Sequence, residues 1–263
     1  MVRRSRLDAE LVRRGLARSR EQAAELVQAG RVRVAGSTAT KPSSGVDPAT
    51  PVLVEQLADL PDYASRGGHK LAGALDLLPD LRVEGRRALD AGASTGGFTD
   101  VLLRRGAREV VAVDVGYGQL AWSLRTDPRV TVHDRMNVRD LSPEAIGGPA
   151  ELTVADLSFI PLVLVLPALA ACTTADGDLL PMVKPQFEVG RENVGPGGVV
   201  RDPQLRARAV LTVAEAAYEL GLGTAGVVRS PLPGPAGNVE FFLWLRRGAP
   251  PADPESVALA VAE

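Results

Sequence analysis

The stretch that decides the fold is Asp90-Ala91-Gly92-Ala93-Ser94-Thr95-Gly96-Gly97-Phe98. It follows an apolar strand predicted at residues 88–90 and opens a helix predicted at 98–105. Glycines here let the backbone turn tightly and approach a ligand, while the start of a helix offers unpaired N–H groups. Asp114 ends the next predicted strand, where a carboxylate can accept the ribose hydroxyls of an adenosine. The pattern predicts a nucleotide-type cofactor, although Asp114 could instead cap a helix.

From residue 67 onward, apolar strand-like segments alternate with helical ones. We expect strands at 88–90, 110–113, 130–132, 152–155, 179–183, 227–228 and 241–245, and helices at 71–78, 98–105 and 205–220. Alternation of this kind predicts an α/β fold, a doubly wound and mostly parallel Rossmann-like sheet. We assign residues 67–247 to this domain, 59–66 to a linker and 248–263 to a C-terminal tail.

The charge of the chain is unevenly distributed along its 263 residues. The formal net charge is -2, yet residues 1–41 alone carry a charge of +6. Such asymmetry predicts a basic docking arm on a neutral-to-acidic body. The alternative is an arginine-rich composition spread over a solvated face. Within the arm, Ser19 and Gln22 form a capping-box pattern, and residues 31–34 alternate arginine and valine as a half-buried strand does.

Cysteine usage and the apolar segments bear on where the protein works. A single cysteine, Cys172, allows no internal disulfide and is typical of a reducing cytoplasm. We predict no secretory signal, because residues 1–6 lead into no apolar stretch. The longest apolar run, 160–172, contains two prolines and falls short of the roughly 20 residues that cross a bilayer. With two histidines and one cysteine, we expect no metal site, and we expect a cytoplasmic protein without membrane contact.

Two cofactors fit the glycine-rich stretch, a nicotinamide dinucleotide and S-adenosylmethionine. A dinucleotide favours a second glycine where Ser94 stands, and no tyrosine has the lysine four residues later that a short-chain dehydrogenase needs. The spacing of Asp90, Gly92 and Gly96 instead resembles the first motif of class I methyltransferases. That resemblance favours S-adenosylmethionine and implies as its binding residues Asp90, Gly92, Ser94, Thr95, Gly96, Gly97, Phe98, Asp114, Val115 and Asp156.

Lysine is rare in this chain, and two of its three lysines lie near the cofactor motif. Unlike arginine, lysine can give up its proton in a protein. Asp156 and Lys184 each follow a predicted strand, and Glu240 begins the last one. The carboxyl ends of parallel strands meet in one crevice, so Asp156 and Lys184 should lie at the mouth of the cofactor site. Lys70, before the first helix, could complete the set, although the four residues could also be ordinary ion pairs.

The N-terminal residues resemble a known RNA-binding module. Arg6-Leu7-Asp8, residues 19–23 and Gly30-Arg31-Val32-Arg33-Val34-Ala35-Gly36 look like the S4-like domain of ribosomal proteins, here assigned to residues 1–58. Proteins of that family lay basic side chains on RNA phosphates and read little sequence, which suits structured RNA. The resemblance implies RNA contacts by Arg3, Arg4, Arg6, Arg14, Arg18, Arg20, Arg31, Arg33, Lys41 and Arg66.

The whole chain resembles the TlyA family of rRNA methyltransferases, historically named haemolysins. Matching motifs are residues 65–71 (SRGGHKL), 113–120 (VDVGYGQL) and 182–188 (MVKPQFE). The four charges, Lys70, Asp156, Lys184 and Glu240, resemble the Lys-Asp-Lys-Glu set of FtsJ-type enzymes. The resemblance implies ribose 2′-O-methylation of cytidine in small-subunit rRNA, and in many members large-subunit rRNA too. Loss of such enzymes is linked to resistance to ribosome-binding cyclic peptide antibiotics.

Several alternatives stay open at this level. A neutral Lys184 could take the proton of the ribose hydroxyl, or a charged Lys184 could only orient its oxygen. The loop 190–198 could cover the cofactor, grip RNA or merely join two elements. A ribosome-binding assembly factor without turnover and a membrane-perforating haemolysin are competing functions. The sequence gives neither the target nucleotide nor the oligomeric state.

Overall fold

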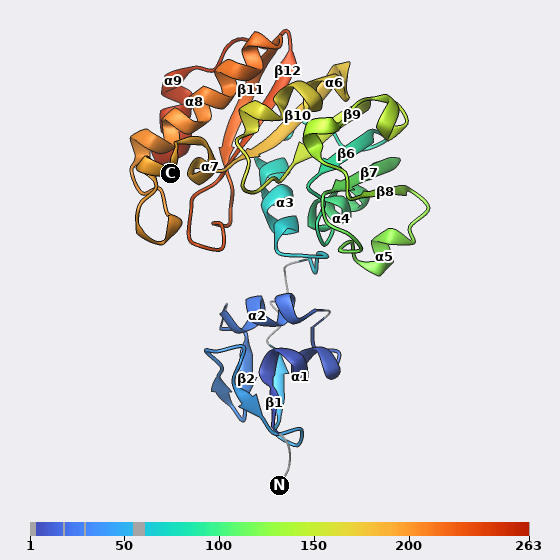
Figure 1. The fold of residues 1–263 in the computed structure, drawn as a ribbon, viewed down its shortest axis with the longest axis vertical. Helices are drawn as coiled ribbons and strands as arrows, with labels where there is room; N and C mark the ends of the chain where they lie inside the picture. The colour runs from blue at the N-terminus through green and yellow to red at the C-terminus, as the bar shows by residue number, and fades with distance from the viewer. Residues whose placement is uncertain (1–3, 18, 29, 55–60, 263) are drawn as a thin grey trace. The chain divides into compact units, whose positions relative to one another are not determined.

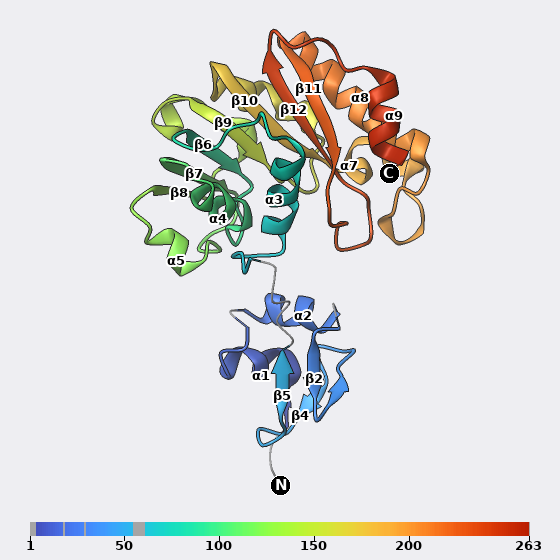
Figure 2. The same cartoon turned by 180° about the vertical axis from the view of Figure 1, so that it is seen from behind.

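The structure, a computed structural model, describes residues 4–17, 19–28, 30–54 and 61–262. The chain divides into two compact units, residues 1–62 and 63–263. In Figures 1 and 2 the smaller unit is blue and the larger unit runs from teal to red.

The smaller unit consists of two helices and short strands. Its elements are β1 (Ser5–Arg6), α1 (Leu7–Arg13), α2 (Arg20–Gln28), β2 (Val32–Val34), β3 (Ser37–Thr38), β4 (Gly45–Val46) and β5 (Val52–Val54). Strand β2 lies between β3 and β5 in an antiparallel sheet, and β1 pairs with β4. The pairing of β1 with β4 was not predicted from the sequence, because a strand of two residues is too short to show an alternating pattern.

Apolar side chains from both helices and from β2 form the core of this unit. The Ser19 hydroxyl accepts a hydrogen bond from the Gln22 N–H at 3.1 Å, so the capping pattern is confirmed on that side. Val32 is fully buried while Arg33 is exposed, as the alternation of residues 31–34 predicts. The buried core residues include Leu7, Leu11, Ala23, Val27 and Val32.

The larger unit is built on a seven-stranded sheet. Its strands are β6 (Arg87–Ala91), β7 (Glu109–Asp114), β8 (Val130–Asp134), β9 (Ala150–Ala155), β10 (Thr173–Val183), β11 (Leu222–Arg229) and β12 (Phe241–Arg247). They lie in the order β11-β12-β10-β9-β6-β7-β8. All neighbouring pairs from β10 to β8 are parallel, whereas β12 is antiparallel to both β10 and β11. The predicted doubly wound, mostly parallel sheet is confirmed.

Helices cover both faces of this sheet. Its main helices are α3 (Gly67–Leu77), α4 (Gly97–Arg104), α5 (Trp122–Arg125), α6 (Leu166–Ala171), α7 (Pro185–Glu188), α8 (Pro203–Glu219) and α9 (Pro254–Ala262). Buried side chains of α6, α8 and α9 share one core with the sheet, and those of α3, α4 and α5 share the other. Each face of the sheet is thus buried by one layer of helices.

Two segments extend beyond the predicted elements. Strand β10 begins at Thr173, six residues before the predicted strand at 179–183. Part of the segment assigned as a tail is helix α9, whose Val257 and Val261 are buried. Figure 2 shows α9 beside α8 and β11. The alanines of α9 left its apolar face hard to recognise in the sequence.

The strand order reverses at the pair β6–β9. The chain runs outward from β6 to β7 and β8, and then returns to place β9 on the other side of β6. In open parallel sheets ligands bind outside the carboxyl ends of the strands at such a switch point. Ala91 and Ala155 end these two strands, and the Asp156 N–H donates to the Ala91 carbonyl oxygen at 3.0 Å.

Candidate active site

The glycine-rich loop leaves β6 and turns directly into α4. Gly92 and Gly96 have positive φ angles of 88° and 96°, where L side chains are strained. A Cβ at Gly92 would collide with the carbonyl oxygen of Asp156, and one at Gly96 would collide with Leu124. The two glycines therefore allow the loop to pack closely against the segment after β9 and against α5.

Asp114, at the end of β7, organises the loops on either side of it. One carboxylate oxygen accepts the Ser94 N–H at 2.8 Å, and the other accepts the Gly116 N–H at 2.7 Å. The next helix, α5, has Ala121 at its N-cap, so Asp114 does not cap it. A carboxylate accepts up to about four hydrogen bonds, which leaves lone pairs for a ligand. Val115, beside it, is exposed.

Asp90 lies beneath the glycine loop and is completely buried. The Thr99 hydroxyl donates to its Oδ2 at 2.6 Å, while Oδ1 has no hydrogen-bond partner among the described residues. Burial, with smaller contributions from Asp156 and Asp114, raises the pKa of Asp90 to about 7. Sequence reasoning missed Thr99, which lies nine residues after Asp90 on α4.

Lys70 and Glu240 form one buried ion pair. Lys70 lies in the first turns of α3, and Glu240 directly precedes β12. Lys70 Nζ lies 2.5 Å from Glu240 Oε2, and both residues are buried. Because 170 residues separate them in the sequence, this contact joins the first helix of the unit to its last strand.

Lys184 and Asp156 form a second ion pair. Lys184 directly follows β10 and is the N-cap residue of α7, while Asp156 directly follows β9. Lys184 Nζ lies 2.6 Å from Asp156 Oδ1 and donates to the Ser158 hydroxyl at 2.9 Å. Lys184 is buried, and the side chain of Asp156 is 24% exposed. Sequence reasoning missed Ser158, whose only signal is its place two residues after Asp156.

The two ion pairs lie at the same end of the sheet. The register between β10 and β12 pairs Val183 with Phe241, so Lys184 and Glu240 continue from neighbouring antiparallel positions. A Cβ at Gly67, in the first turn of the helix that carries Lys70, would lie 3.9 Å from Asp156 Oδ2. The four predicted charges thus gather at the carboxyl ends of β9 and β10, beside the glycine loop.

Glu188, four residues after Lys184, is a further acidic group near this site. Its Oε1 accepts the Leu162 N–H at 2.9 Å. Burial raises the pKa of Glu188 to about 7. The sequence motif at 182–188 contains this residue but gives no sign of its partner.

In the smaller unit, two predicted RNA-contacting residues pair with one aspartate. Arg6 and Arg20 lie 2.8 and 3.1 Å from Asp8 Oδ2, and their side chains are about half exposed. The Arg6 guanidinium in particular lowers the pKa of Asp8 to about 2. Arg4, Arg33 and Lys41 are exposed as well.

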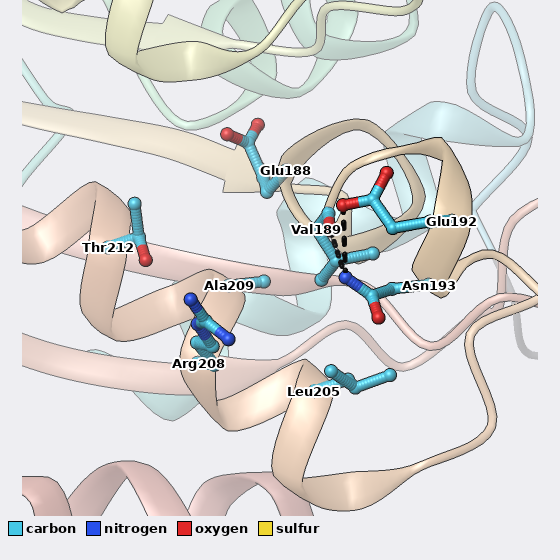
Figure 3. A pocket seen from close by; sticks show the side chains of 8 residues that line it. All are labelled: Glu188, Val189, Glu192, Asn193, Leu205, Arg208, Ala209 and Thr212. Atoms are coloured by element: carbon cyan, nitrogen blue, oxygen red, sulfur yellow. Dashed lines mark hydrogen bonds between the residues drawn. The ribbon is translucent and has the colours of Figure 1, made fainter.

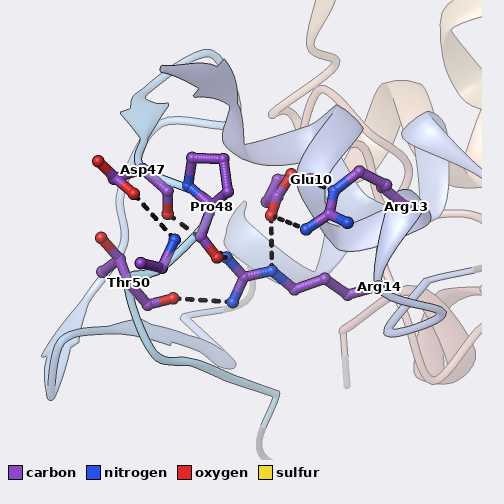
Figure 4. A network of polar contacts seen from close by, with 7 residues as sticks. Glu10, Arg13, Arg14, Asp47, Pro48 and Thr50 are labelled. Atoms are coloured by element: carbon purple, nitrogen blue, oxygen red, sulfur yellow. Dashed lines mark hydrogen bonds and ion pairs between the residues drawn. The ribbon is translucent and has the colours of Figure 1, made fainter. Parts of the chain in front are cut away.

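Arg14 belongs to an internal network, shown in Figure 4. Its guanidinium donates to the carbonyl oxygens of Thr50 and Pro48, each at 2.8 Å, and to Glu10 at 2.7 Å. Arg13 also donates to Glu10, at 2.6 Å. Together, with Arg13 first, the two guanidinium groups lower the pKa of Glu10 to about 2. The Arg14 side chain is 19% exposed, so this network uses most of its surface.

The other predicted RNA contacts are scattered. Arg31 is partly buried, and Arg66 donates to the Pro233 carbonyl oxygen at 3.0 Å. Arg3 and Arg18 lie outside the described residues.

Cys172 is fully buried, and burial raises the pKa of its thiol to about 11.

The described part of the chain bears on membranes and metals as well. No helix within residues 4–17, 19–28, 30–54 and 61–262 has the length and apolar character to span a membrane. In those same ranges, no three His, Cys, Asp or Glu residues lie together as metal ligands.

Comparison with known proteins identifies both units. Residues 63–247 match the family described as FtsJ-like methyltransferase, and residues 5–52 match the S4 domain. A relative from Mycobacterium tuberculosis, named 16S/23S rRNA (cytidine-2'-O)-methyltransferase TlyA, is 64% identical over 94% of this chain and 91% of its own. A Campylobacter jejuni relative, named 23S rRNA (cytidine-2'-O)-methyltransferase TlyA, is 33% identical over 69% of this chain and 70% of its own.

A solved structure gives the same result. A hemolysin-named protein from Streptococcus thermophilus has a TM-score of 0.79 and 39% identity, covering 100% of this chain and 96% of that one. The fold and the site define a methyltransferase of the FtsJ-like class that carries an S4 domain. The chain belongs to the TlyA family of rRNA methyltransferases, as the sequence motifs predict.

Proposed function

We propose that the chain transfers a methyl group from S-adenosylmethionine to the ribose 2′-hydroxyl of cytidine in ribosomal RNA. The observation that carries this proposal is the presence of two ion pairs, Lys70–Glu240 and Lys184–Asp156, beside the glycine loop at the switch point. The relatives from M. tuberculosis and C. jejuni are named for this activity, the first on 16S and 23S rRNA and the second on 23S rRNA. We extend it to small-subunit rRNA and, as a second substrate, large-subunit rRNA.

The residues around the glycine loop suit S-adenosylmethionine. Gly92 and Gly96 let the backbone approach the ligand, and the free lone pairs of Asp114 can accept ribose hydroxyls of its adenosine. The buried, unpartnered Oδ1 of Asp90 is an acceptor beneath the loop. When bound, S-adenosylmethionine supplies a methyl group on a positively charged sulfur. The binding set is the one expected from the sequence, Asp90, Gly92, Ser94, Thr95, Gly96, Gly97, Phe98, Asp114, Val115 and Asp156.

Lys184 is the group that acts on the ribose hydroxyl. A neutral amine has two N–H groups and one lone pair. One N–H donates to the Ser158 hydroxyl, and the other can turn to Asp156 Oδ1, which lies 2.6 Å away and has no hydrogen-bond partner among the described residues. The lone pair is then left to receive the hydroxyl proton as the oxygen attacks the methyl carbon. Such general-base help contributes roughly 10²–10⁴ in rate. If Lys184 stays protonated, its third N–H orients the same oxygen and alignment supplies the gain.

Lys70 and Glu240 set the charge and shape of the other side of the site. Buried ion pairs add little net stability, because desolvation offsets their attraction. Removing one partner, however, leaves an uncompensated charge and costs about 3–5 kcal/mol. We therefore assign this pair to the site itself, where it fixes α3 relative to β12 and keeps a cation near the reacting oxygen.

The smaller unit supplies affinity for RNA. Its exposed cations, Arg4, Arg33 and Lys41, can bind phosphates without reading bases, which suits folded RNA. The same role is proposed for Arg3, Arg6, Arg18, Arg20, Arg31 and Arg66, whereas the internal contacts of Arg14 favour a structural role. A ribose within a helix must also be exposed by flipping, at a cost of a few kcal/mol. A ribosomal substrate places the enzyme in the cytoplasm.

One experiment separates this function from its competitor, a ribosome-binding assembly factor. Purified protein is incubated with unmodified 30S and 50S subunits and S-adenosylmethionine carrying a labelled methyl group. We expect label in rRNA, and mapping of ribose methylation should give a cytidine. Subunit binding without label in rRNA would favour the assembly factor, and label on a base rather than a ribose would refute the assigned chemistry.

A further inference from the structure

The segment between β9 and the next short helix carries two partners of Lys184. This segment, residues 156–162, contains Asp156 and Ser158, which lie 2.6 and 2.9 Å from Lys184 Nζ. Its first residue is tied to β6 by the hydrogen bond from the Asp156 N–H to the Ala91 carbonyl oxygen. The position of Ser158 then depends on what holds the far end of the segment.

Helix α7 holds that far end. It is a single turn, residues 185–188, that begins directly after Lys184. At its other end, Glu188 Oε1 accepts the N–H of Leu162, the first residue of a 3₁₀ turn at Leu162–Leu164. The preceding residue, Pro161, makes no side-chain cap there. Glu188 thus caps this turn from a distant part of the chain.

Contacts along α7 therefore touch the same segment at three places. Lys184 contacts Asp156 and Ser158, the Phe187 ring lies 5.3 Å from the Phe159 ring, and Glu188 binds the Leu162 N–H. Phe159 has a φ of 65°, an unusual value for a bulky residue. A backbone in that conformation persists only when its surroundings hold it.

The surroundings of Glu188 also favour its contact with the Leu162 N–H. The residue borders a pocket of about 280 Å³ between α7 and α8, lined also by Glu192, Asn193 and Arg208. Figure 3 shows the Glu188 carboxylate directed away from Arg208 and Asn193, while Asn193 hydrogen-bonds to Val189 and Glu192. Placing a carboxyl group in a desolvated site is costly unless a hydrogen bond compensates. The hydrogen bond from the Leu162 N–H provides this compensation.

We propose that Glu188 is a positioning residue that holds the segment 156–162 so that Ser158 and Asp156 direct Lys184 at the reacting oxygen. This inference rests on the proposed function and deepens it. Glu188 acts through the N–H of Leu162. Alignment errors of about 1 Å at reacting atoms can cost around 100-fold in rate, so a slackened segment should lower turnover more than binding.

Two variants separate the reach of the side chain from its charge. Glu188→Asp keeps an ionisable carboxyl group but is one methylene too short to reach the Leu162 N–H. Glu188→Gln keeps the reach and an acceptor oxygen but has no charge. We expect Glu188→Asp to lower kcat about tenfold with little change in KM for S-adenosylmethionine or RNA, and Glu188→Gln to keep most of the wild-type kcat. Glu215→Asp, the same change at an exposed position of α8, is the control and should match wild type.

The measurement is methyl transfer to ribosomal subunits, with kcat expressed per donor-binding site counted by calorimetry. Counting sites keeps the comparison valid if part of a preparation is unfolded. Wild-type kcat in Glu188→Asp, or an equal loss in Glu188→Gln, would overturn the proposal. A loss confined to the number of binding sites would make Glu188 a purely structural residue and overturn it as well. An inactive wild-type enzyme would instead refute the proposed function.

Discussion

In the smaller unit, the buried carboxylates of Asp8 and Glu10 each lie against two arginines, whereas in the larger unit Asp90 and Glu188 are held by a threonine hydroxyl and a backbone N–H. The arginines lower both pKa values to about 2, and burial raises the other two to about 7. Asp8 and Glu10 therefore stay charged over a wide pH range, whereas Asp90 and Glu188 favour their protonated form.

The cations of the two units differ in the same way. Arginine, permanently charged, dominates the smaller unit, where its half-exposed groups suit a polyanionic partner. The larger unit buries lysines, Lys70 and Lys184, against carboxylates at its candidate active site. A lysine can exchange a proton there, and an arginine cannot. Under the proposed function, RNA binding therefore uses arginines of the smaller unit and the chemistry uses lysines of the larger unit.

The strongest test of this division removes the lysine from the chemistry. Lys184→Ala should lower kcat for methyl transfer at least about 100-fold, because it removes the group facing the ribose oxygen. The dissociation constants for S-adenosylmethionine and for RNA, measured by calorimetry and filter binding, should stay near wild type. Arg82→Ala removes an exposed cation of the same unit and serves as the control. Turnover close to wild type would exclude Lys184 from the mechanism.

A second test compares two cations within the smaller unit. Lys41→Ala should reduce the slope of log K for RNA binding against log salt by about 0.9, the value for one lost phosphate contact. Arg14→Ala should instead lower the thermal unfolding temperature by several degrees, because the carbonyl groups of Pro48 and Thr50 lose their donor. Salt titrations and calorimetric melts measure the two effects. A large change of salt slope in Arg14→Ala would show that its outward contacts matter more than its network.

The pKa shifts predict stability slopes of opposite sign in the two units. Asp8 and Glu10 have folded pKa values of about 2 against ordinary values of 3.8 and 4.5, so their stabilisation is lost as pH falls from about 5 toward 2. Asp90 and Glu188 take up protons in the folded state up to about pH 7, so they make the larger unit lose stability as pH rises from about 5 to 7. The carboxyl groups of the same unit with lowered pKa values contribute below that range; they are Asp127, Asp134, Glu144, Glu151 and Asp253. Hydrogen exchange of β2 and β6 amides in the full chain measures both. Parallel slopes would contradict the comparison.

The smallest expected effect is a change in the pH dependence of stability in a variant of Asp90. Asp90→Asn removes one of the two raised groups and keeps an acceptor for Thr99. The loss of stability between about pH 5 and 7 should shrink by roughly half, because Asp90 and Glu188 have shifts of similar size. The readout is exchange of the β6 amides across that range. An unchanged slope would mean that Asp90 ionises normally in the folded protein.

Local sequence patterns predicted much of the fold and part of the candidate active site. Most strand positions, the glycine loop and the basic arm follow from alternation, glycine spacing and charge. Asp156 and Lys184 could be brought together because they end parallel strands, a rule that holds whatever the partner strands are. For the same reason Asp114 could be placed beside the loop, where its two N–H contacts lie.

Pairing across long sequence distances could not be predicted in this way. That Lys70 contacts Glu240 depends on β12 lying antiparallel between β10 and β11, an order that no local pattern encodes. The partners Ser158 and Leu162 depend on how one irregular segment folds back on α7. Helix α9 was missed because small residues weaken its period, although Val257 and Val261 are buried.

The contact between Lys70 and Glu240 has a consequence for biosynthesis. A nascent chain that does not yet include residue 240 already contains the glycine loop, Asp156 and Lys184. Its Lys70, however, lacks the carboxylate of Glu240. The last strand must also insert between two others before the sheet is complete. The ion pair between Lys70 and Glu240, and with it the candidate active site, therefore forms only after the ribosome has translated residue 240.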